Sequence, residues 1–323
     1  MSRTEVSRRA SRLTIGARSL FIALGILAVA ASASFSASNQ FVILSDIHPA
    51  RGAEPQLALL LDQLLELRPA FIVTLGDMDG DPEPDAGPDD LNHAMQLFHR
   101  LREAGIEIYP TIGNHDGNPK INYICNHTPP MNIEFDPAVN PIVAERWCHD
   151  RRFWYSFNRG GIHFAIINSN VGPGHAQWEG MREWMVRDLC EHASNPNRFP
   201  TLLFLHHPQW MTGDRGCTSR PAYRLLAECP NNTVAAVFAG DWHSGRNFPP
   251  ESNVGIQVYA TEASVHLVVD NPEYIVATVH PDRITFEKVD TKTGGPSKTN
   301  IVYYPIAGNF TSLANRSQHR GAG

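Results

Sequence analysis

The sequence lacks several features that would place it in a large class of proteins. No apolar run reaches the roughly 20 residues of a membrane span, so no stable membrane span is expected. Lysine is scarce, and 33 acidic residues outnumber 27 basic ones, giving a formal charge of −6. This balance excludes a broad basic surface for nucleic acid. Hydrophobic residues still make up 42% of the chain, which is enough for a sizeable core.

The cysteines also exclude a common type of site. No Cys-x-x-Cys motif occurs, so a thiolate zinc site is not expected. The number of cysteines is odd, so at least one thiol stays unpaired in a monomer. Pairing of Cys217 with Cys229 and of Cys125 with Cys148 remains open, with Cys190, in a helical pattern, as the candidate free thiol.

The N-terminus has the pattern of a secretory signal peptide. Five arginines precede an apolar run from Leu20 to Ala31, and small residues follow as far as Ala37. This arrangement predicts a cleaved signal over residues 1–37 and an exported protein, periplasmic, secreted or extracellular. The Ser7-Arg8-Arg9 sequence leaves the twin-arginine route open. An uncleaved anchor is the alternative, although about 12 apolar residues are short for a span.

The remaining chain reads as one α/β domain over residues 38–308, followed by a polar tail, 309–323, that is expected to be frayed. Loops rich in polar residues and proline at 79–90 and 117–152 are expected at the rim of a site. Short apolar runs predict strands at Phe41–Leu44, Phe71–Leu75, Ile106–Thr111, Phe153–Phe157, Ile162–Asn168, Thr201–Leu205 and Val234–Ala239. Leucine-rich or amphipathic spacing predicts helices at Pro55–Leu67, Asp89–Ala104 and Gln177–His192.

Two groups of strands break the alternation with helices. The strands at 153–157 and 162–168 flank Gly160 and Gly161, which predicts a hairpin. Three further runs are interpreted as an antiparallel tail, so the sheet system is expected to be mixed; they are Val254–Tyr259, Tyr274–His280 and Ile284–Val289.

Polar residues follow five of the predicted strands at the point where each strand ends. A single such residue is usually a cap or a turn former. Five endings at equivalent positions indicate one site, because ligands bind at the carboxyl ends of strands in open α/β sheets. Carboxylates and imidazoles gathered together require a compensating cation, and this donor set suits Fe, Mn or Zn. The endings are Asp46-Ile47-His48, Gly76-Asp77, Gly113-Asn114-His115-Asp116, His206-His207 and Gly240-Asp241-Trp242-His243.

In this order the five endings resemble the signature of the calcineurin-like metallophosphoesterases, which is D-x-H, G-D-x-x-D or a variant, G-N-H-D or G-N-H-E, a later His and G-H-x-H. The resemblance extends over about residues 40–290. It implies a mixed α/β fold, a four-layer α/β/β/α sandwich of two mixed sheets flanked by helices. It also implies hydrolysis of a phosphate monoester or diester by metal-activated hydroxide, with a small phosphate ester as substrate and two divalent or trivalent metal ions (Mn, Fe or Zn) as cofactors.

The resemblance also implies a role for each residue. Asp77 would bridge two metals. The first metal would be held by Asp46, His48 and His243, and the second by Asn114 and His206. His115 would interact with the phosphate and the leaving group, and Asp116 would orient His115. The oligomeric state is not readable from the sequence.

One position departs from the family signature, because Asp241 stands where the motif has its first His. Asp can replace His as a ligand through oxygen. Alternatively the second site is weak or lost, and the chain is a non-catalytic scaffold. Among enzymes, acid phosphatase, cyclic nucleotide phosphodiesterase, nucleotidase and phospholipid-headgroup hydrolase remain open. The purple acid phosphatase pattern has a tyrosine ligand three residues after the bridging Asp. This chain has Gly80 at that position, which argues against a purple acid phosphatase.

Overall fold

The structure is a computed structural model of the chain. It describes residues 38–48, 53–78, 97–116, 152–213, 220–229, 231–248, 256–265, 271–298, 303, 305–311, 313 and 318–319. The predicted signal peptide, the loop 79–90 and almost all of the segment 117–152 lie outside the described residues.

The first sheet has six strands and carries three of the five polar endings. Strands β1, β2 and β3 run parallel to one another, while β10 lies antiparallel to β1 and β11 antiparallel to β10. The spatial order is β12 (Ile306–Ala307), β11 (Arg283–Asp290), β10 (Glu273–Val279), β1 (Gln40–Leu44), β2 (Phe71–Thr74) and β3 (Glu107–Tyr109).

The second sheet has seven strands and carries the other two polar endings. Strands β5, β6, β7 and β9 are parallel, and the outer pairs are antiparallel. The predicted hairpin is confirmed, because Arg159 pairs with Ile162 across Gly160 and Gly161, both at positive φ. The order is β13 (Gln318–His319), β4 (Tyr155–Arg159), β5 (Ile162–Ile166), β6 (Thr201–Phe204), β7 (Val234–Ala239), β9 (Gln257–Ala260) and β8 (Arg246–Phe248).

The two sheets enclose an aromatic core between them. Phe41 of the first sheet meets Phe164 of the second edge-to-face, with ring centroids 5.3 Å apart. Phe164 in turn stacks on Phe157, with 4.7 Å between centroids. Such pairs contribute about 0.5–1.5 kcal/mol beyond the area they bury. The buried aromatic rings therefore join the two sheets.

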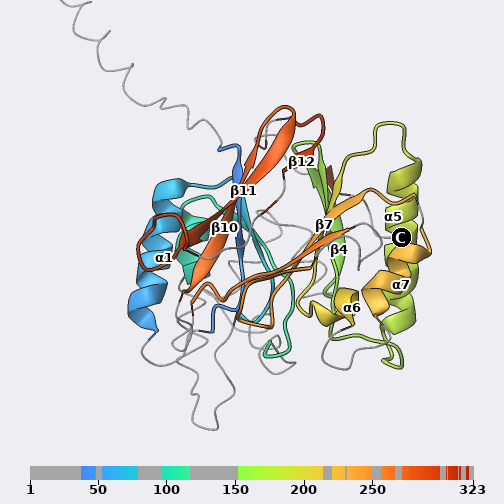
Figure 1. Cartoon of the computed structure of the whole chain (residues 1–323), viewed down its shortest axis with the longest axis horizontal. Coiled ribbons are helices and arrows are strands. Elements are labelled where there is room, and N and C mark those ends of the chain that lie inside the picture. The colour runs from blue at the N-terminus through green and yellow to red at the C-terminus, as the bar shows by residue number, and fades with distance from the viewer. Residues whose placement is uncertain are drawn as a thin grey trace, which may run out of the picture. The chain divides into compact units, whose positions relative to one another are not determined.

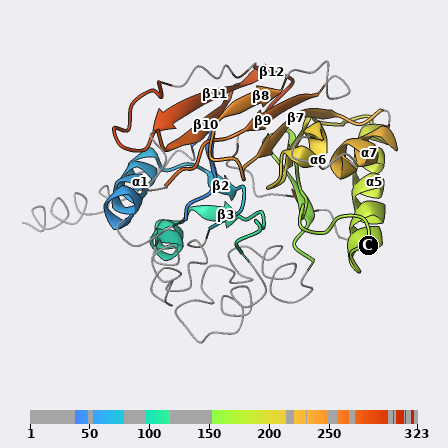
Figure 2. The same cartoon turned by 60° about the horizontal axis from the view of Figure 1, so that its bottom comes forward.

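Helices cover the outer faces of both sheets, as Figures 1 and 2 show. Helix α1 (Glu54–Leu67) buries Leu57, Leu60, Leu61 and Leu64 against the first sheet, and residues 97–103 form another helical stretch. The second sheet is covered by α5 (Trp178–Ser194), α6 (Gln209–Thr212) and α7 (Pro221–Ala227). The predicted sandwich of two mixed sheets flanked by helices is confirmed.

One strand of the expected antiparallel tail lies in the other sheet. Strands β10 and β11 pair as predicted, but β9 runs parallel to β7. The grouping of Val254–Tyr259 with them was therefore wrong. A short buried strand shows the same apolar pattern in either sheet, because local sequence does not encode its partner.

A disulfide among the described residues differs from both expected pairings. Cys190 in α5 pairs with Cys229, which follows α7, with 5.5 Å between their Cα atoms. The predictions of a free Cys190 and of a Cys217–Cys229 pair were wrong, because α5 and α7 lie side by side on one face of the second sheet. Cys125, Cys148 and Cys217 lie outside the described residues.

The beginning of the C-terminal segment packs into the core. Phe310 and Leu313 are buried, and the Leu313 carbonyl accepts a hydrogen bond from Arg159 Nε at 2.8 Å. The expectation of fraying was wrong for these residues, because the two apolar side chains are buried and the backbone N–H groups of Phe310 and Thr311 donate to the carbonyls of Pro281 and Gly160. The domain boundary at residue 308 stays a prediction.

Candidate metal centre

The loops that follow the parallel strands are tied to one another by backbone hydrogen bonds. The N–H groups of Ile47 and His48 both donate to the carbonyl of Asp77, at 2.9 and 3.3 Å. In the second sheet, the Gly240 N–H donates to the carbonyl of His206 at 2.9 Å. The strand endings of each sheet therefore form a connected edge.

Four predicted ligands form a first group at this edge: Asp46, His48, Asp77 and His243. His243 Nε2 lies 3.1 Å from Asp46 Oδ1 and 3.1 Å from His48 Nε2. His48 Nε2 lies 3.5 Å from Asp77 Oδ2. Three of these side chains are buried, while that of His243 is 28% exposed.

A second group adjoins the first through Asp77. His206 Nε2 lies 3.2 Å from Asp77 Oδ2, 2.8 Å from Asn114 Oδ1 and 3.9 Å from Asp241 Oδ1. His206 Nδ1 lies 2.7 Å from the carbonyl of Leu75, which can only accept. The ring proton of neutral His206 is therefore on Nδ1, and the lone pair of Nε2 faces the site.

The backbone at the site adopts conformations that most residues avoid. Asp46, His48, Asp77, Asp241 and His243 all have positive φ values between 31° and 67°. Strain of this kind costs on the order of 1–3 kcal/mol per residue and concentrates at functional sites.

Gly113 is required at the edge for a different reason. A Cβ atom at this position would collide with the side chain and backbone N of Asp77. The Gly-Asn-His-Asp turn can therefore approach the Asp77 loop only with glycine at its start.

Charge is the dominant electrostatic feature of the site. Burial raises the pKa of the Asp46 carboxyl, but hydrogen bonds to His243 and His48 outweigh burial and hold it well below its usual range. The pKa of Asp77 is lowered in the same way by His206 and His48. Burial lowers the pKa of His48 and His206, yet the neighbouring carboxylates raise it to about 10 and about 9.

These shifts test whether the residues fit a metal ion. The buried carboxylates of Asp46 and Asp77 stabilise the protonated forms of two neighbouring imidazoles. The site therefore favours bound positive charge. A cation bound by the same nitrogen and oxygen atoms supplies that charge without the protons. The residues therefore fit metal ions with mixed nitrogen and oxygen ligands.

His115 and Asp116 lie beside Asp77 in different ways. The His115 side chain is 26% exposed, and its Nε2 lies 3.9 Å from Asp77 Oδ2. Asp116 is buried, and its carboxylate accepts hydrogen bonds of 2.8–3.0 Å from the backbone N–H groups of Asp77, Met78 and Gly113. Asp116 therefore joins the loops after β2 and β3. Its predicted role of orienting His115 stays a prediction, as do the ligand roles of the other residues.

Sequence reasoning missed two residues that follow β5. Ser169 Oγ accepts hydrogen bonds from the backbone N–H groups of His206 and His207, at 3.2 and 3.0 Å. Asn170 Nδ2 donates to the carbonyl of Gly113 at 3.1 Å. The signal was present, because the strand predicted at 162–168 also runs into polar residues.

The aromatic residues near the ligands pack inward. Trp210, Met211 and Trp242 are all buried, so they support the loops under the site. Arg246 is exposed, and its guanidinium carbon lies 5.2 Å from the centroid of the Trp242 ring.

Comparison with known proteins gives a match to one family model and to several solved structures. The model described as calcineurin-like phosphoesterase matches residues 40–245. A dimetal phosphatase from Danio rerio has a TM-score of 0.58 at 14% identity, covering 84% of this chain and 99% of its own. The sequence matches no curated protein.

Two further structures share the fold. GAP50, described as the anchor in the inner membrane complex of Plasmodium, has a TM-score of 0.55 at 14% identity, covering 85% of this chain and 90% of its own. The purple acid phosphatase PPD1 from yellow lupin has a TM-score of 0.51 at 11% identity, covering 83% of this chain and 53% of its own. At such identities these structures show the fold alone. Within the described part of the chain, no helix is long and apolar enough to cross a bilayer.

Proposed function

Because this chain belongs to the calcineurin-like phosphoesterase family and is a metal-dependent phosphoric-ester hydrolase, we propose that it hydrolyses a small phosphate monoester or diester, after export from the cytoplasm, with two metal ions bound at the edge of its sheets. Mn, Fe and Zn are the candidate metals, because the donors are oxygen and imidazole nitrogen.

The arrangement around Asp77 is the observation that carries the proposal. Its Oδ2 atom lies 3.5 Å from His48 of the first group and 3.2 Å from His206 of the second. One carboxylate therefore faces two clusters of donors, as a bridge between two cations requires. Asp46, His48 and His243 would hold the first cation, and Asn114, His206 and Asp241 would hold the second.

The cations and His115 would have different roles in the reaction. The cations held by these residues would offset the charge of the phosphate and lower the pKa of water, which would supply a nucleophile near neutral pH. His115 lies at the exposed side of the site and can donate a proton to the leaving oxygen or a hydrogen bond to the phosphate. Its backbone N–H donates to Asp77 Oδ1 at 2.8 Å, which fixes the His115 turn to the bridging residue.

The position of Asp241 favours an enzyme over a non-catalytic scaffold. Its Oδ1 atom lies 3.9 Å from His206 Nε2, and its Oδ2 accepts a hydrogen bond from Gln209 Nε2 at 3.3 Å. The second group therefore keeps a donor where the family motif has His, with oxygen in place of nitrogen. Because Asp adds negative charge, the second site should prefer the harder cations Mn and Fe.

Turnover of a panel of phosphate monoesters and diesters tests the reaction. Protein stripped of metal and reloaded with Mn, Fe or Zn should hydrolyse at least one ester class, and the stripped protein should not. The exposed Asp282→Asn variant provides a control for loss of a carboxylate away from the site. A fully loaded protein that turns over no ester would favour the scaffold.

Export is tested separately by N-terminal sequencing of material outside the cytoplasm. The mature chain should begin near Ser34 or Ser38, since cleavage is expected after Ala33 or Ala37. A chain that begins at Met1 or Ser2 and is extracted only by detergent would favour the anchor.

A further inference from the structure

The two carboxylate oxygens of Asp46 have different surroundings. Oδ1 faces the first group, 3.1 Å from His243 Nε2 and 3.8 Å from His48 Nε2. Oδ2 accepts a hydrogen bond from the hydroxyl of Ser45. The backbone N–H of Asp241 lies 3.2 Å from both oxygens. The Ser45 hydroxyl therefore makes the carboxylate asymmetric.

Ser264 makes hydrogen bonds with both the backbone N–H and the backbone carbonyl of Ser45. The Ser264 N–H donates to the Ser45 carbonyl at 2.7 Å, and the Ser45 N–H donates to Ser264 Oγ at 3.0 Å. The Ser264 hydroxyl donates in turn to the Glu273 carbonyl at 3.1 Å. Both serines are buried, with 2% of the surface of Ser45 and 0% of that of Ser264 exposed. Bulk water therefore does not compete for these hydrogen-bonding groups.

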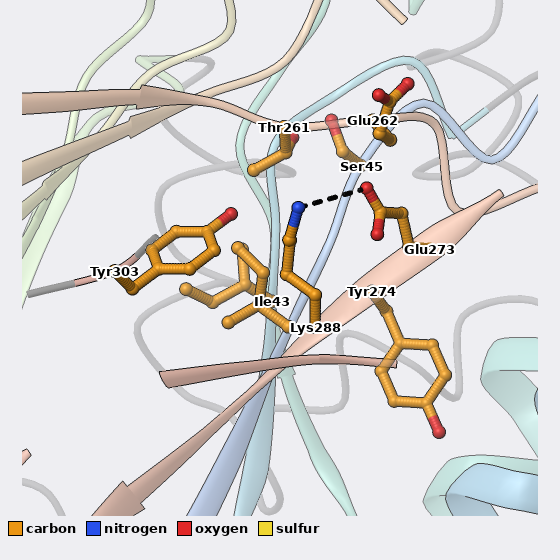
Figure 3. Close-up of a pocket in the computed structure, with 9 residues that line it drawn as sticks. Ile43, Ser45, Thr261, Glu262, Glu273, Tyr274, Lys288 and Tyr303 are labelled. Atoms are coloured by element: carbon orange, nitrogen blue, oxygen red, sulfur yellow. Dashed lines mark ion pairs between the residues drawn. The ribbon is translucent and has the colours of Figure 1, made fainter. Parts of the chain in front are cut away.

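A small pocket lies on the other side of Ser45, and Figure 3 shows the side chains that line it. Its volume is about 10 Å³, close to the space that one water molecule needs. Lys288 Nζ lies 3.7 Å from Glu273 Oε1, and these side chains are only 7% and 3% exposed. The pocket offers room for about one water molecule beside Ser45, and the ion pair holds Glu273, whose carbonyl accepts the hydrogen bond from Ser264.

We propose that Ser45 is a positioning residue for the first metal. Its hydroxyl donates a hydrogen bond to Oδ2 of Asp46, so that Oδ1 is the carboxylate oxygen that binds the cation. Ser264 holds Ser45 in place for this purpose. The inference rests on the proposed function, since it assigns a role toward the metal that Asp46 would bind. Partners that orient a ligand in this way typically change metal affinity by about 10–100-fold when they are removed.

Titration of the metal-free full-length chain with Mn²⁺ tests the proposal without reference to activity. Ser45→Ala should weaken the binding of the first cation by about 10–100-fold. Ser156→Ala is a matched control, because Ser156 Oγ also donates to a buried carboxylate, Asp188 Oδ1, at 2.8 Å. Each variant loses one buried hydroxyl, but the control should keep the wild-type affinity.

Ser264→Ala provides a second variant that leaves both Ser45 and Asp46 intact. It removes the acceptor of the Ser45 N–H, so it should also weaken the first cation, and it carries the test if Ser45→Ala does not fold. Wild-type affinity in either folded variant, or an equal loss in Ser156→Ala, would overturn the positioning role. A wild-type chain that binds no Mn²⁺, Fe or Zn would overturn the proposed function itself.

Discussion

At the scale of single residues, Asp241 separates two accounts of the second metal. If it is a ligand, Asp241→Ala leaves Asn114, His206 and the shared Asp77, a set that should bind the second cation weakly. Metal content should fall from two ions towards one, with partial rescue of activity by excess Mn. Asp241→His should retain two ions and move the preference towards Zn, because imidazole is the softer donor.

Two results would contradict a ligand role for Asp241. The first is an Asp241→Ala protein that keeps both metals and full activity. The second is a native chain with one metal to which Asp241→His adds another, which would mark the second site as lost.

His115 should affect rate and not metal content. His115→Ala should lower turnover by about 10²–10⁴-fold, the range of a general acid or base, with bound metal unchanged. The loss should be smaller for esters with good leaving groups, because these need less protonation. His99→Ala, on the helical stretch 97–103 and paired there with Glu103, is the control. Equal losses across leaving groups would exclude proton donation but not phosphate stabilisation.

At the scale of elements, the strands and the pairs joined by a short turn were predictable, whereas the pairing of strands far apart in the sequence was not. Runs such as Phe41–Leu44 and Val234–Ala239 are continuous apolar segments bounded by polar residues, and both are strands. The placement of β9 beside β7 depends on contacts distant in sequence, as does the position of Ser264 against Ser45. The polar endings were visible because strand direction alone places them at one edge.

The Cys190–Cys229 disulfide was not predicted, because it too depends on a contact between segments distant in sequence. This disulfide should contribute to stability. It joins residues 39 apart, and closing a loop of this length contributes about 4 kcal/mol in the chain-entropy model. The Cys190→Ala/Cys229→Ala variant should therefore lose about 2–4 kcal/mol of unfolding free energy in urea. Reductant should lower the stability of the wild type by about this amount more than it lowers that of the variant. Equal stability of the two oxidised proteins would contradict the bond.

At the scale of the whole molecule, the metal-free protein should show a characteristic dependence of stability on pH. The pKa of His48 and His206 is raised from 6.5 to about 10 and about 9. Their stabilising contribution is therefore complete below pH 6.5, declines as pH rises, and is lost above about pH 10. The lowered pKa of Asp46 and Asp77 adds stability above pH 3.8 that is lost as pH falls.

Metal binding should become stronger as pH rises, because the histidine ligands must be deprotonated to bind a metal ion. Bound metal should therefore stabilise the protein most at alkaline pH, where the metal-free protein loses stability. The difference in melting temperature between Mn-loaded and metal-free protein should therefore grow from pH 5 to pH 9. Scanning fluorimetry over this range measures it directly. A difference that stays constant with pH would show that the two histidines do not bind the metal.

Metal stoichiometry tests most directly whether one carboxylate, that of Asp77, serves two cations. Elemental analysis of the purified wild-type chain should give two metal ions per chain. Asp77→Asn should lose metal and nearly all activity while its far-ultraviolet circular dichroism remains that of the wild type. An Asp77→Asn protein that still holds two metal ions per chain would contradict the bridging role.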